Sequence, residues 1–137
     1  MTAAISFDGH WPEDETPIGI DVATRQFLRA HFRYAQQDRF YCVCPDETAA
    51  TLYRKFGTEA DIAAERCISV NQNDAEALET AGCLIRYDPG IIKYAWARRY
   101  HGENRYSLCG IAHACASESA MDIFGQYYTA PLHTWDA

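Results

Sequence analysis

His113 is the residue with the clearest capacity for chemistry, because it is the one polar side chain in the small or apolar run 108–116. A run of this composition is typical of a central parallel strand that is covered on both faces. Ligands of open α/β sheets bind outside the carboxyl ends of the strands, and His113 comes near the carboxyl end of this one. We therefore predict a catalytic role for His113, with a satisfied core histidine as the alternative.

Gly19, Asp88 and Ser117 are predicted as substrate-binding residues. Gly19 precedes a long predicted helix, where a glycine either lets the backbone approach a ligand or simply makes a turn. Asp88 follows a neighbouring predicted strand, so it either lines the same crevice as His113 or serves as a turn residue before Pro89. Ser117 stands where its hydroxyl can cap the next predicted helix.

The cysteines near these residues are weak candidates for metal or redox chemistry. Cys109, His113 and Cys115 share one strand face, but residues two apart on a strand project in parallel about 6.6 Å apart. Tetrahedral zinc sites take ligands from turns and a second element, and no C-x-x-C turn is present. We predict no metal and no cofactor. Cys42 and Cys44 also share a face, and we expect them to be inert structural thiols.

Composition restricts the class of protein. A chain of 137 residues suits one domain and is long enough to bury about two-thirds of its unfolded surface. Apolar residues at 48% and aromatic residues at 13% exclude a disordered chain, and the six cysteines are expected as free thiols. A net charge of −7 without a basic stripe argues against a nucleic-acid partner.

No apolar run approaches the roughly 20 residues of a membrane span. The opening residues also lack the positive start and apolar middle of a secretory signal. We therefore expect no membrane span and a cytoplasmic location.

Predicted strands and helices alternate along the chain. Strands are expected at 40–44, 67–70, 83–87 and in the run 108–116, with a possible short strand at 3–7. Helices are expected after Gly19, at 47–56 with Gly57 as the stop, up to Gly82, at 91–100, and from Ser117 to about Tyr128. The alternation predicts an α/β fold, a Rossmann-like three-layer sandwich with a mainly parallel sheet. Asp8 lies outside these elements and is assigned no role.

Helical spacing predicts the sides of two helices that face the core. The stripe of the first helix consists of Phe27, Leu28, His31, Phe32 and Ala35, and that of the last helix of Met121, Phe124 and Tyr128. Residues 131–137 have the composition of a turn leading into a further strand, so we expect a piece of a larger protein. An exposed sheet edge would then favour self-association.

The stretch YSLCGIAHACAS at 106–117 resembles the family 4 glycosyltransferases, which have two Rossmann-like domains facing one another across a cleft. Three further segments are similar to the same bacterial subgroup: the Pro17-Ile18-Gly19 turn, the stretch from Tyr87-Asp88-Pro89-Gly90 to Arg98-Arg99, and Trp135-Asp136-Ala137. The resemblance implies that Gly19 approaches the diphosphate of a nucleotide-sugar donor and that His113 contacts the transferring sugar.

Residues 1–137 are accordingly expected to form a single Rossmann-like domain, the acceptor-side N-terminal half of a two-domain glycosyltransferase. The resemblance implies a nucleotide-sugar donor and an acceptor as partners, with the donor held mainly by a second domain. The alternative is a stand-alone, non-catalytic α/β binding or interaction domain, since a fold does not imply a function.

Overall fold

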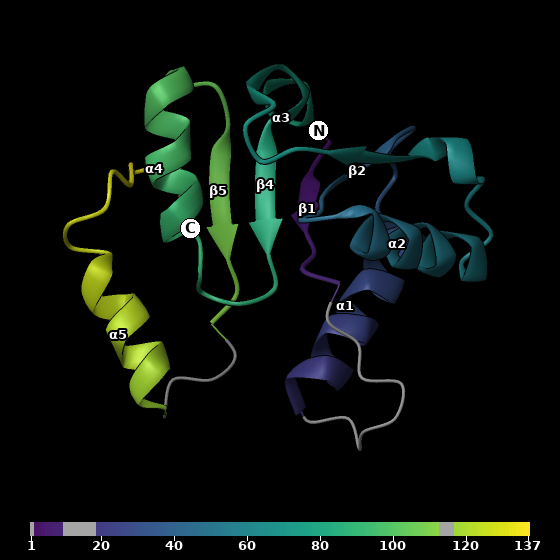
Figure 1. The fold of residues 1–137 in the computed structure, drawn as a ribbon, viewed down its shortest axis with the longest axis horizontal. Coiled ribbons are helices and arrows are strands. Elements are labelled where there is room, and N and C mark those ends of the chain that lie inside the picture. The colour runs from purple at the N-terminus through teal and green to yellow at the C-terminus, as the bar shows by residue number, and fades with distance from the viewer. Residues whose placement is uncertain (1, 10–18, 113–116) are drawn as a thin grey trace.

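The computed structural model describes residues 2–9, 19–112 and 117–137 (Figure 1). The strands are β1 (Ala4–Ser6), β2 (Phe40–Val43), β3 (Cys67–Val70), β4 (Cys83–Arg86) and β5 (Ser107–Gly110). The helices are α1 (Gly19–Tyr34), α2 (Glu47–Glu59), α3 (Ala75–Ala81), α4 (Ile92–His101) and α5 (Glu118–Gln126), with a 3-10 turn, η1 (Ala64–Arg66).

The five strands form one parallel sheet in the order β3-β2-β1-β4-β5. This arrangement confirms the predicted Rossmann-like α/β sandwich. The chain builds β1, β2 and β3 in one direction and then returns to place β4 on the other side of β1. The strand order therefore reverses between β1 and β4, and ligands of such sheets bind in the crevice at the carboxyl ends near that point.

Two apolar clusters pack on opposite faces of the sheet. Side chains alternate between them along each strand, so that Ala4 belongs to the cluster beside α3 and α4, and Ile5 to the cluster beside α1 and α2. The predicted stripe of α1 is confirmed by Leu28 and Phe32, which are buried. Each such side chain contributes about 1.5–3 kcal/mol on full burial. Partial burial of His31 on the same stripe lowers its pKa to about 4.

The prediction of a long central strand at 108–116 is wrong. β5 ends at Gly110 and forms an edge of the sheet beside β4, whereas the three-residue β1 takes the central place and is wholly buried. Small side chains made the run look like a covered strand, but strand order depends on crossovers between distant segments. His113 lies outside the described residues.

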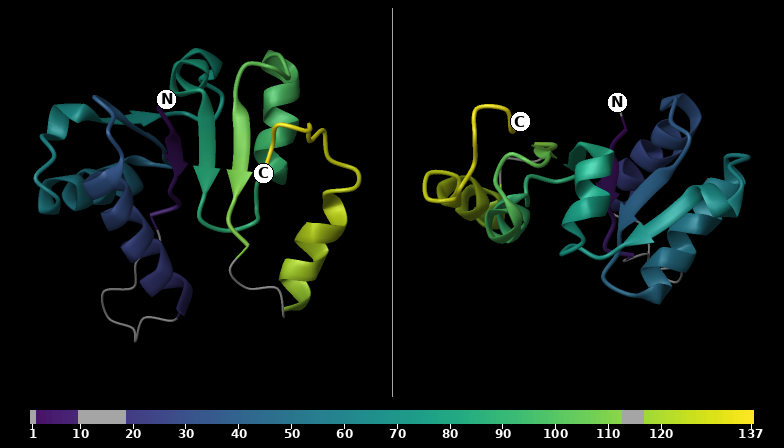
Figure 2. Two further views of the ribbon diagram at one scale, coloured as in Figure 1. Left: turned by 180° about the vertical axis from the view of Figure 1, so that it is seen from behind. Right: turned by 90° about the horizontal axis from the view of Figure 1, so that it is seen from above.

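The predicted inward stripe of α5 is also wrong for Met121 and Tyr128, whose exposed fractions are 59% and 94%. Figures 1 and 2 show α5 at the opposite end of the molecule from α2. Its last turn is held by Tyr127, whose hydroxyl donates to the Pro89 carbonyl. Periodicity identifies the residues that share a stripe, but it does not determine whether another element covers them.

The predicted caps at three helix ends agree with the structure. Asp46 accepts a hydrogen bond from the Ala49 amide at 2.9 Å and caps α2, as predicted. Asp74 caps α3 in the same way, and Gly82 ends α3 in the left-handed conformation with φ of +75°.

Gly57 does not stop α2, which continues to Glu59. A β-carbon at this position would lie 2.6 Å from the Cys67 sulfur. The glycine therefore permits close packing of α2 against the start of β3, a contact that no local signal reveals.

The C-terminal segment pairs with the outer edge of β5. The Ala137 amide donates to the Leu108 carbonyl at 2.9 Å, and the Gly110 amide donates to the Ala137 carbonyl at 2.7 Å. A carboxylate oxygen of Asp136 accepts from the Leu108 amide at 2.8 Å. This edge is therefore engaged along Leu108 and Gly110, and the expected exposed edge is not found there.

Replacing Gly9 with alanine is expected to destabilise the domain by about 2–4 kcal/mol, from left-handed backbone strain and overpacking together. Gly9 has φ of +70°, and an added β-carbon would lie 2.4 Å from the Ala49 β-carbon. Urea unfolding measures the loss. Gly19→Ala is the matched control, because its added β-carbon would meet nothing within 4 Å. Equal losses in the two variants would contradict this account.

Candidate functional site

A cavity of about 220 Å³ opens at the carboxyl ends of three parallel strands. Asp8 follows β1, Cys44 and Pro45 follow β2, and Asn71 and Gln72 follow β3. The remaining lining residues are Val43 at the end of β2 and Lys93 and Tyr94 in the first turn of α4. These segments meet because the strands are parallel and all end at the same edge of the sheet. The cavity therefore lies where ligands of this architecture bind.

Arg86, the last residue of β4, joins two carboxylates beside the cavity. Its Nε and Nη2 atoms donate to Asp88 at 2.6 and 2.7 Å, and its Nη2 and Nη1 atoms donate to Asp8 at 2.7 and 3.2 Å. Paired contacts of this kind hold the two carboxylates in defined orientations. The side chain of Arg86 is 11% exposed and that of Asp8 is 38% exposed, so Asp8 is the member of the group that solvent and ligands can reach.

Ser6 links this charged group to the cavity wall. Arg86 Nη1 donates to the Ser6 hydroxyl at 3.1 Å, and that hydroxyl shares a 2.5 Å hydrogen bond with the Tyr94 hydroxyl. Ser6 is completely buried and Tyr94 is almost so. The polar atoms of β1, β4 and α4 are thus connected, which fixes the Tyr94 ring at the wall.

The charges around Asp8 favour its ionised form. Burial by itself raises the pKa of this carboxyl, but hydrogen bonds and charge from Arg86, together with the charge of Lys93, bring its pKa below the usual value. Burial likewise opposes ionisation of Arg86, yet its bonds to Asp8 and Asp88 hold its pKa above the usual value. Asp8 is therefore an anionic hydrogen-bond acceptor at neutral pH.

The lining offers both donors and acceptors. Asp8 supplies an acceptor, Lys93 supplies three N–H donors, and the amides of Asn71 and Gln72 supply both kinds of group. Among the described residues of the lining, the formal charges are one carboxylate and one ammonium, so they balance. Such a lining suits a neutral ligand rich in hydroxyl groups.

Asp88 lies at the carboxyl end of β4, as predicted, but it contacts Arg86 and is not among the residues lining the cavity. Its Oδ1 atom also accepts from the Gly90 amide at 2.7 Å, which is the turn role foreseen as the alternative. The two roles coexist, and Asp88 positions Asp8 through Arg86.

Among the described residues, neither Gly19 nor Ser117 lines this cavity. Gly19 begins α1 and is exposed, with open space around the position of a β-carbon. Ser117 caps α5, accepting from the Ala120 amide at 3.2 Å. The predicted catalytic residue His113 lies outside the described residues, so its role stays a prediction.

Sequence reasoning missed Asp8, Lys93 and the pair Asn71-Gln72. A signal existed for two of these positions, because Asp8 and Asn71 follow the predicted strands 3–7 and 67–70 directly. Polar residues directly after the strands of an α/β protein are candidates for ligand binding. No sequence signal indicated Lys93, since its place beside Asp8 depends on the pairing of β1 with β4.

The described residues hold neither a cluster of metal ligands nor a helix that could span a membrane. Ranges 2–9, 19–112 and 117–137 hold no group of three or more His, Cys, Asp or Glu side chains arranged for a metal ion. Within the same ranges, no helix is long and apolar enough to cross a membrane.

Comparison with known proteins adds no relative to this description. No protein-family model, no curated protein and no solved structure matches the chain.

Proposed function

We propose that this chain is the acceptor-side domain of a glycosyltransferase with two facing Rossmann-like domains, and that the cavity binds a hydroxyl-bearing acceptor. The observation that carries the proposal is the cavity at the carboxyl ends of β1, β2 and β3, lined by Asp8, Asn71, Gln72 and Lys93. Sugars and other polyols are bound through the same combination of carboxylate, amide and ammonium groups.

The size of the cavity supports one small group as its occupant. Pockets that enclose drug-sized ligands measure about 300–1,000 Å³, and this one measures about 220 Å³. A single ring or a short polyol fits this volume, whereas a nucleotide sugar would have to extend out of it. The remainder of such a donor would lie against a second domain.

The charge of the cavity also disfavours the donor diphosphate as its occupant. Stabilising a leaving diphosphate requires a clamp of cations or aligned backbone dipoles. Among the described residues of the lining, Lys93 is the single cation, and the negative charge of Asp8 offsets its positive charge. We therefore expect a second domain to supply the clamp, with the present domain forming only one side of the cleft.

The expected role of Asp8 is to orient an acceptor hydroxyl. A general base works best with a pKa near the operating pH, and the pKa of Asp8 is held below its usual value. Asp8 is therefore suited to accept a hydrogen bond and poorly suited to remove a proton. In this proposal His113 contacts the transferring sugar from the segment after β5, a role that follows from the resemblance.

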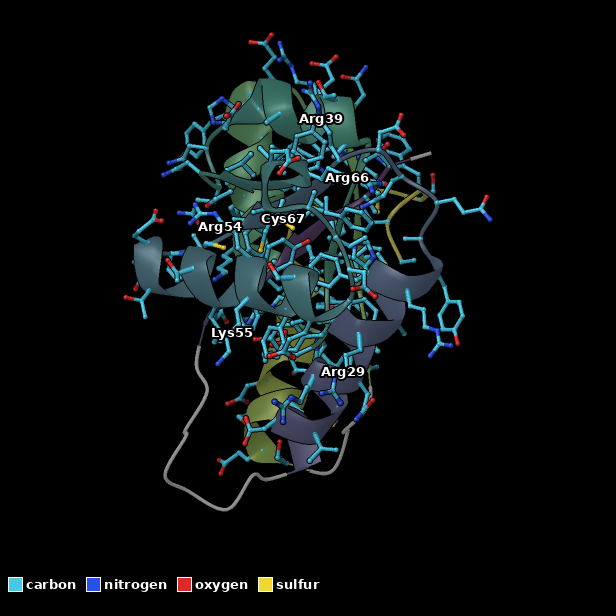
Figure 3. The ribbon with its side chains drawn as sticks, turned by 90° about the vertical axis from the view of Figure 1, so that its right-hand side faces the viewer. Arg29, Arg39, Arg54, Lys55, Arg66 and Cys67 are labelled. Atoms are coloured by element: carbon cyan, nitrogen blue, oxygen red, sulfur yellow. The ribbon has the colours of Figure 1, made fainter. Side chains whose placement is uncertain are left out.

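Saturation-transfer NMR on the 137-residue chain tests the proposal, with methyl glucoside, methyl mannoside and glycerol as acceptor probes. We expect binding of at least one probe, weakened about fivefold by Gln72→Ala or by Lys93→Gln, since each loses one hydrogen bond. Lys55→Gln is the matched control, because this exposed lysine lies on α2 outside the cavity lining (Figure 3).

A hydrolysis assay with UDP-glucose and GDP-mannose on the same samples tests whether this domain forms only one side of the cleft. No turnover is expected from this chain alone. Turnover would show that one domain houses a complete site and would overturn the acceptor-side assignment. Equal weakening by Lys55→Gln, or no binding of any probe, would remove the cavity from the proposal.

A different observation favours an interaction domain as the second candidate. Large apolar side chains are exposed on α4, on α5 and in the C-terminal segment, namely Trp96, Tyr100, Met121, Tyr128 and Trp135. A contiguous patch of such side chains would mark a surface that binds proteins. Absence of sugar binding, together with association in light scattering that Trp96→Ser and Tyr128→Ser reverse, would select this candidate.

A further inference from the structure

Cys42 and Cys44 bring their sulfur atoms within 3.2 Å of each other. Alternation on a regular strand would separate parallel side chains by about 6.6 Å. The sulfurs come closer because β2 ends at Val43, so that Cys44 lies just beyond the strand. Each of the two sulfurs is therefore within reach of the other without movement of distant elements.

The two thiols differ in access. Cys42 is completely buried among the side chains between the sheet and α2, whereas Cys44 is partly exposed and lines the cavity. A small reagent that enters the cavity would therefore meet Cys44 first. Cys42 would meet the product of that reaction from inside the protein.

The surroundings of Cys44 favour its thiolate. The Cys44 thiol donates to the Cys42 sulfur at 3.2 Å. When Cys44 ionises, the Cys42 thiol becomes the donor, and this hydrogen bond lowers the pKa of Cys44. A hydrogen bond from Ser69 and the charge of Arg54 act in the same direction, while partial burial and the charge of Asp46 oppose them. The net pKa of Cys44 lies below the usual value, and burial raises that of Cys42. The thiolate is the reactive form of cysteine.

We propose that Cys44 and Cys42 form a peroxide-sensitive dithiol, in which Cys44 is the attacking residue and Cys42 the resolving residue. The proposal stands on the sulfur contact and on the opening of the cavity at Cys44. It is independent of the sugar-binding function, because oxidation can be followed without any substrate.

The chemistry balances with hydrogen peroxide as the oxidant. The Cys44 thiolate attacks one peroxide oxygen, the O–O bond breaks, and the hydroxide that leaves takes a proton to become water. The Cys42 sulfur then attacks the sulfur of the Cys44 sulfenic acid, forming the S–S bond. The sulfenic hydroxyl leaves with the Cys42 proton as a second water. Two electrons pass from the two thiols to one peroxide.

The product would be a strained and readily reduced disulfide. Two residues of strand span about 6.4–6.8 Å, at the upper end of the range of Cα separations that disulfides adopt. Such bonds return to thiols easily. Since Cys44 is one of the residues that line the cavity with Asp8 and Asn71, bond formation would change this part of the lining.

Cys67 is the competing partner and must be distinguished from Cys42. It begins β3 and packs beneath α2 at Gly57, and it lies near enough to Arg54 for that charge to act on its thiol (both are labelled in Figure 3). Trypsin distinguishes the two partners of Cys44. Cleavage after Arg39 and Arg54 releases peptide 40–54, which holds Cys42 and Cys44 but no other cysteine. Cleavage after Arg66 leaves Cys67 in a different peptide.

The experiment exposes the folded 137-residue chain to hydrogen peroxide, alkylates the remaining thiols and measures peptide masses. We expect peptide 40–54 to lose two hydrogen atoms and to resist alkylation until dithiothreitol is added. Two of the six thiols then disappear, leaving four. In Cys42→Ala, dimedone should trap a sulfenic acid on Cys44. Cys83→Ala, on β4, is the matched control and should behave as the wild type.

Several outcomes would overturn the proposal. These are a cross-link between peptide 40–54 and the peptide holding Cys67, preferential dimedone labelling of another cysteine, or equal alkylation of Cys42 and Cys44 before and after peroxide. Circular dichroism on Cys42→Ala verifies folding. If that variant is unfolded, the disulfide in the wild-type peptide decides the question alone.

Discussion

Replacing Asp136 with alanine is expected to destabilise the domain by about 3–5 kcal/mol, because the change leaves a buried guanidinium without its counter-charge. Arg98 is completely buried and donates to the two Asp136 oxygens at 2.7 and 2.6 Å. Asp136 is 3% exposed and accepts also from the amides of Leu108 and His133. One carboxylate thus joins α4, β5 and the C-terminal segment.

Urea unfolding at pH 7 measures this loss. Asp136→Asn should lose less, because its amide oxygen can still accept from the backbone. Glu79→Ala is the matched control, since its ion pair with Arg105 is exposed and is expected to contribute at most about 1 kcal/mol. A loss in Asp136→Ala no larger than that of the control would contradict a stabilising role for the Arg98–Asp136 ion pair.

Acid should weaken the same ion pair between Arg98 and Asp136. Burial raises the pKa of Asp136, but hydrogen bonds from Arg98, His133 and Leu108 outweigh this effect and leave the pKa below its usual value. The stabilisation is therefore complete above about pH 4, the value for the unfolded carboxyl, and is lost as the pH falls further. The wild type should lose more stability between about pH 5 and pH 3 than Asp136→Asn does.

Replacing Arg86 with methionine is expected to cost about 2–4 kcal/mol, somewhat less than a fully buried pair because Asp8 is partly exposed. The variant removes the cation that joins Asp8 to Asp88, and the buried Ser6 hydroxyl loses a donor. Binding of the sugar probes should also weaken, since Asp8 would no longer be oriented toward the cavity.

The pH dependence separates charge from packing in this variant. Without Arg86, repulsion from Asp88 should raise the pKa of Asp8, so protonation of Asp8 should restore stability as the pH falls from about 7 to about 4.5. In the wild type, the lowered pKa of Asp8 maintains stability over the same range. A difference between the two proteins that stays constant with pH would assign the loss to packing alone.

Much of the local structure could be predicted from the residues. Asp46, Asp74 and Ser117 cap helices because their side chains accept bonds from amides only three residues away. Gly82 ends α3 because the last turn requires a left-handed residue there. These interactions are complete within one turn of the chain, so their pattern survives in the sequence.

The candidate site could be predicted only in part. Asp88 was recognised as a strand-end carboxylate, but its partner Arg86 was not, although the two are neighbours in sequence. Asp8 is 78 positions from Arg86 in the chain and reaches it only because β1 pairs with β4. A pattern read along one segment contains no record of such a pairing.

The sequence by itself determined the alternation of strands and helices, and with it the parallel Rossmann-like class, because side-chain periodicity and capping are local. Only the tertiary structure decided that β1 is central and β5 an edge, that α5 leaves Met121 and Tyr128 exposed, and that Asp8 meets Arg86. Each of these depends on which distant segments pair across the sheet. That choice is set by the combined burial and hydrogen bonding of the whole chain, and no single stretch of residues specifies it.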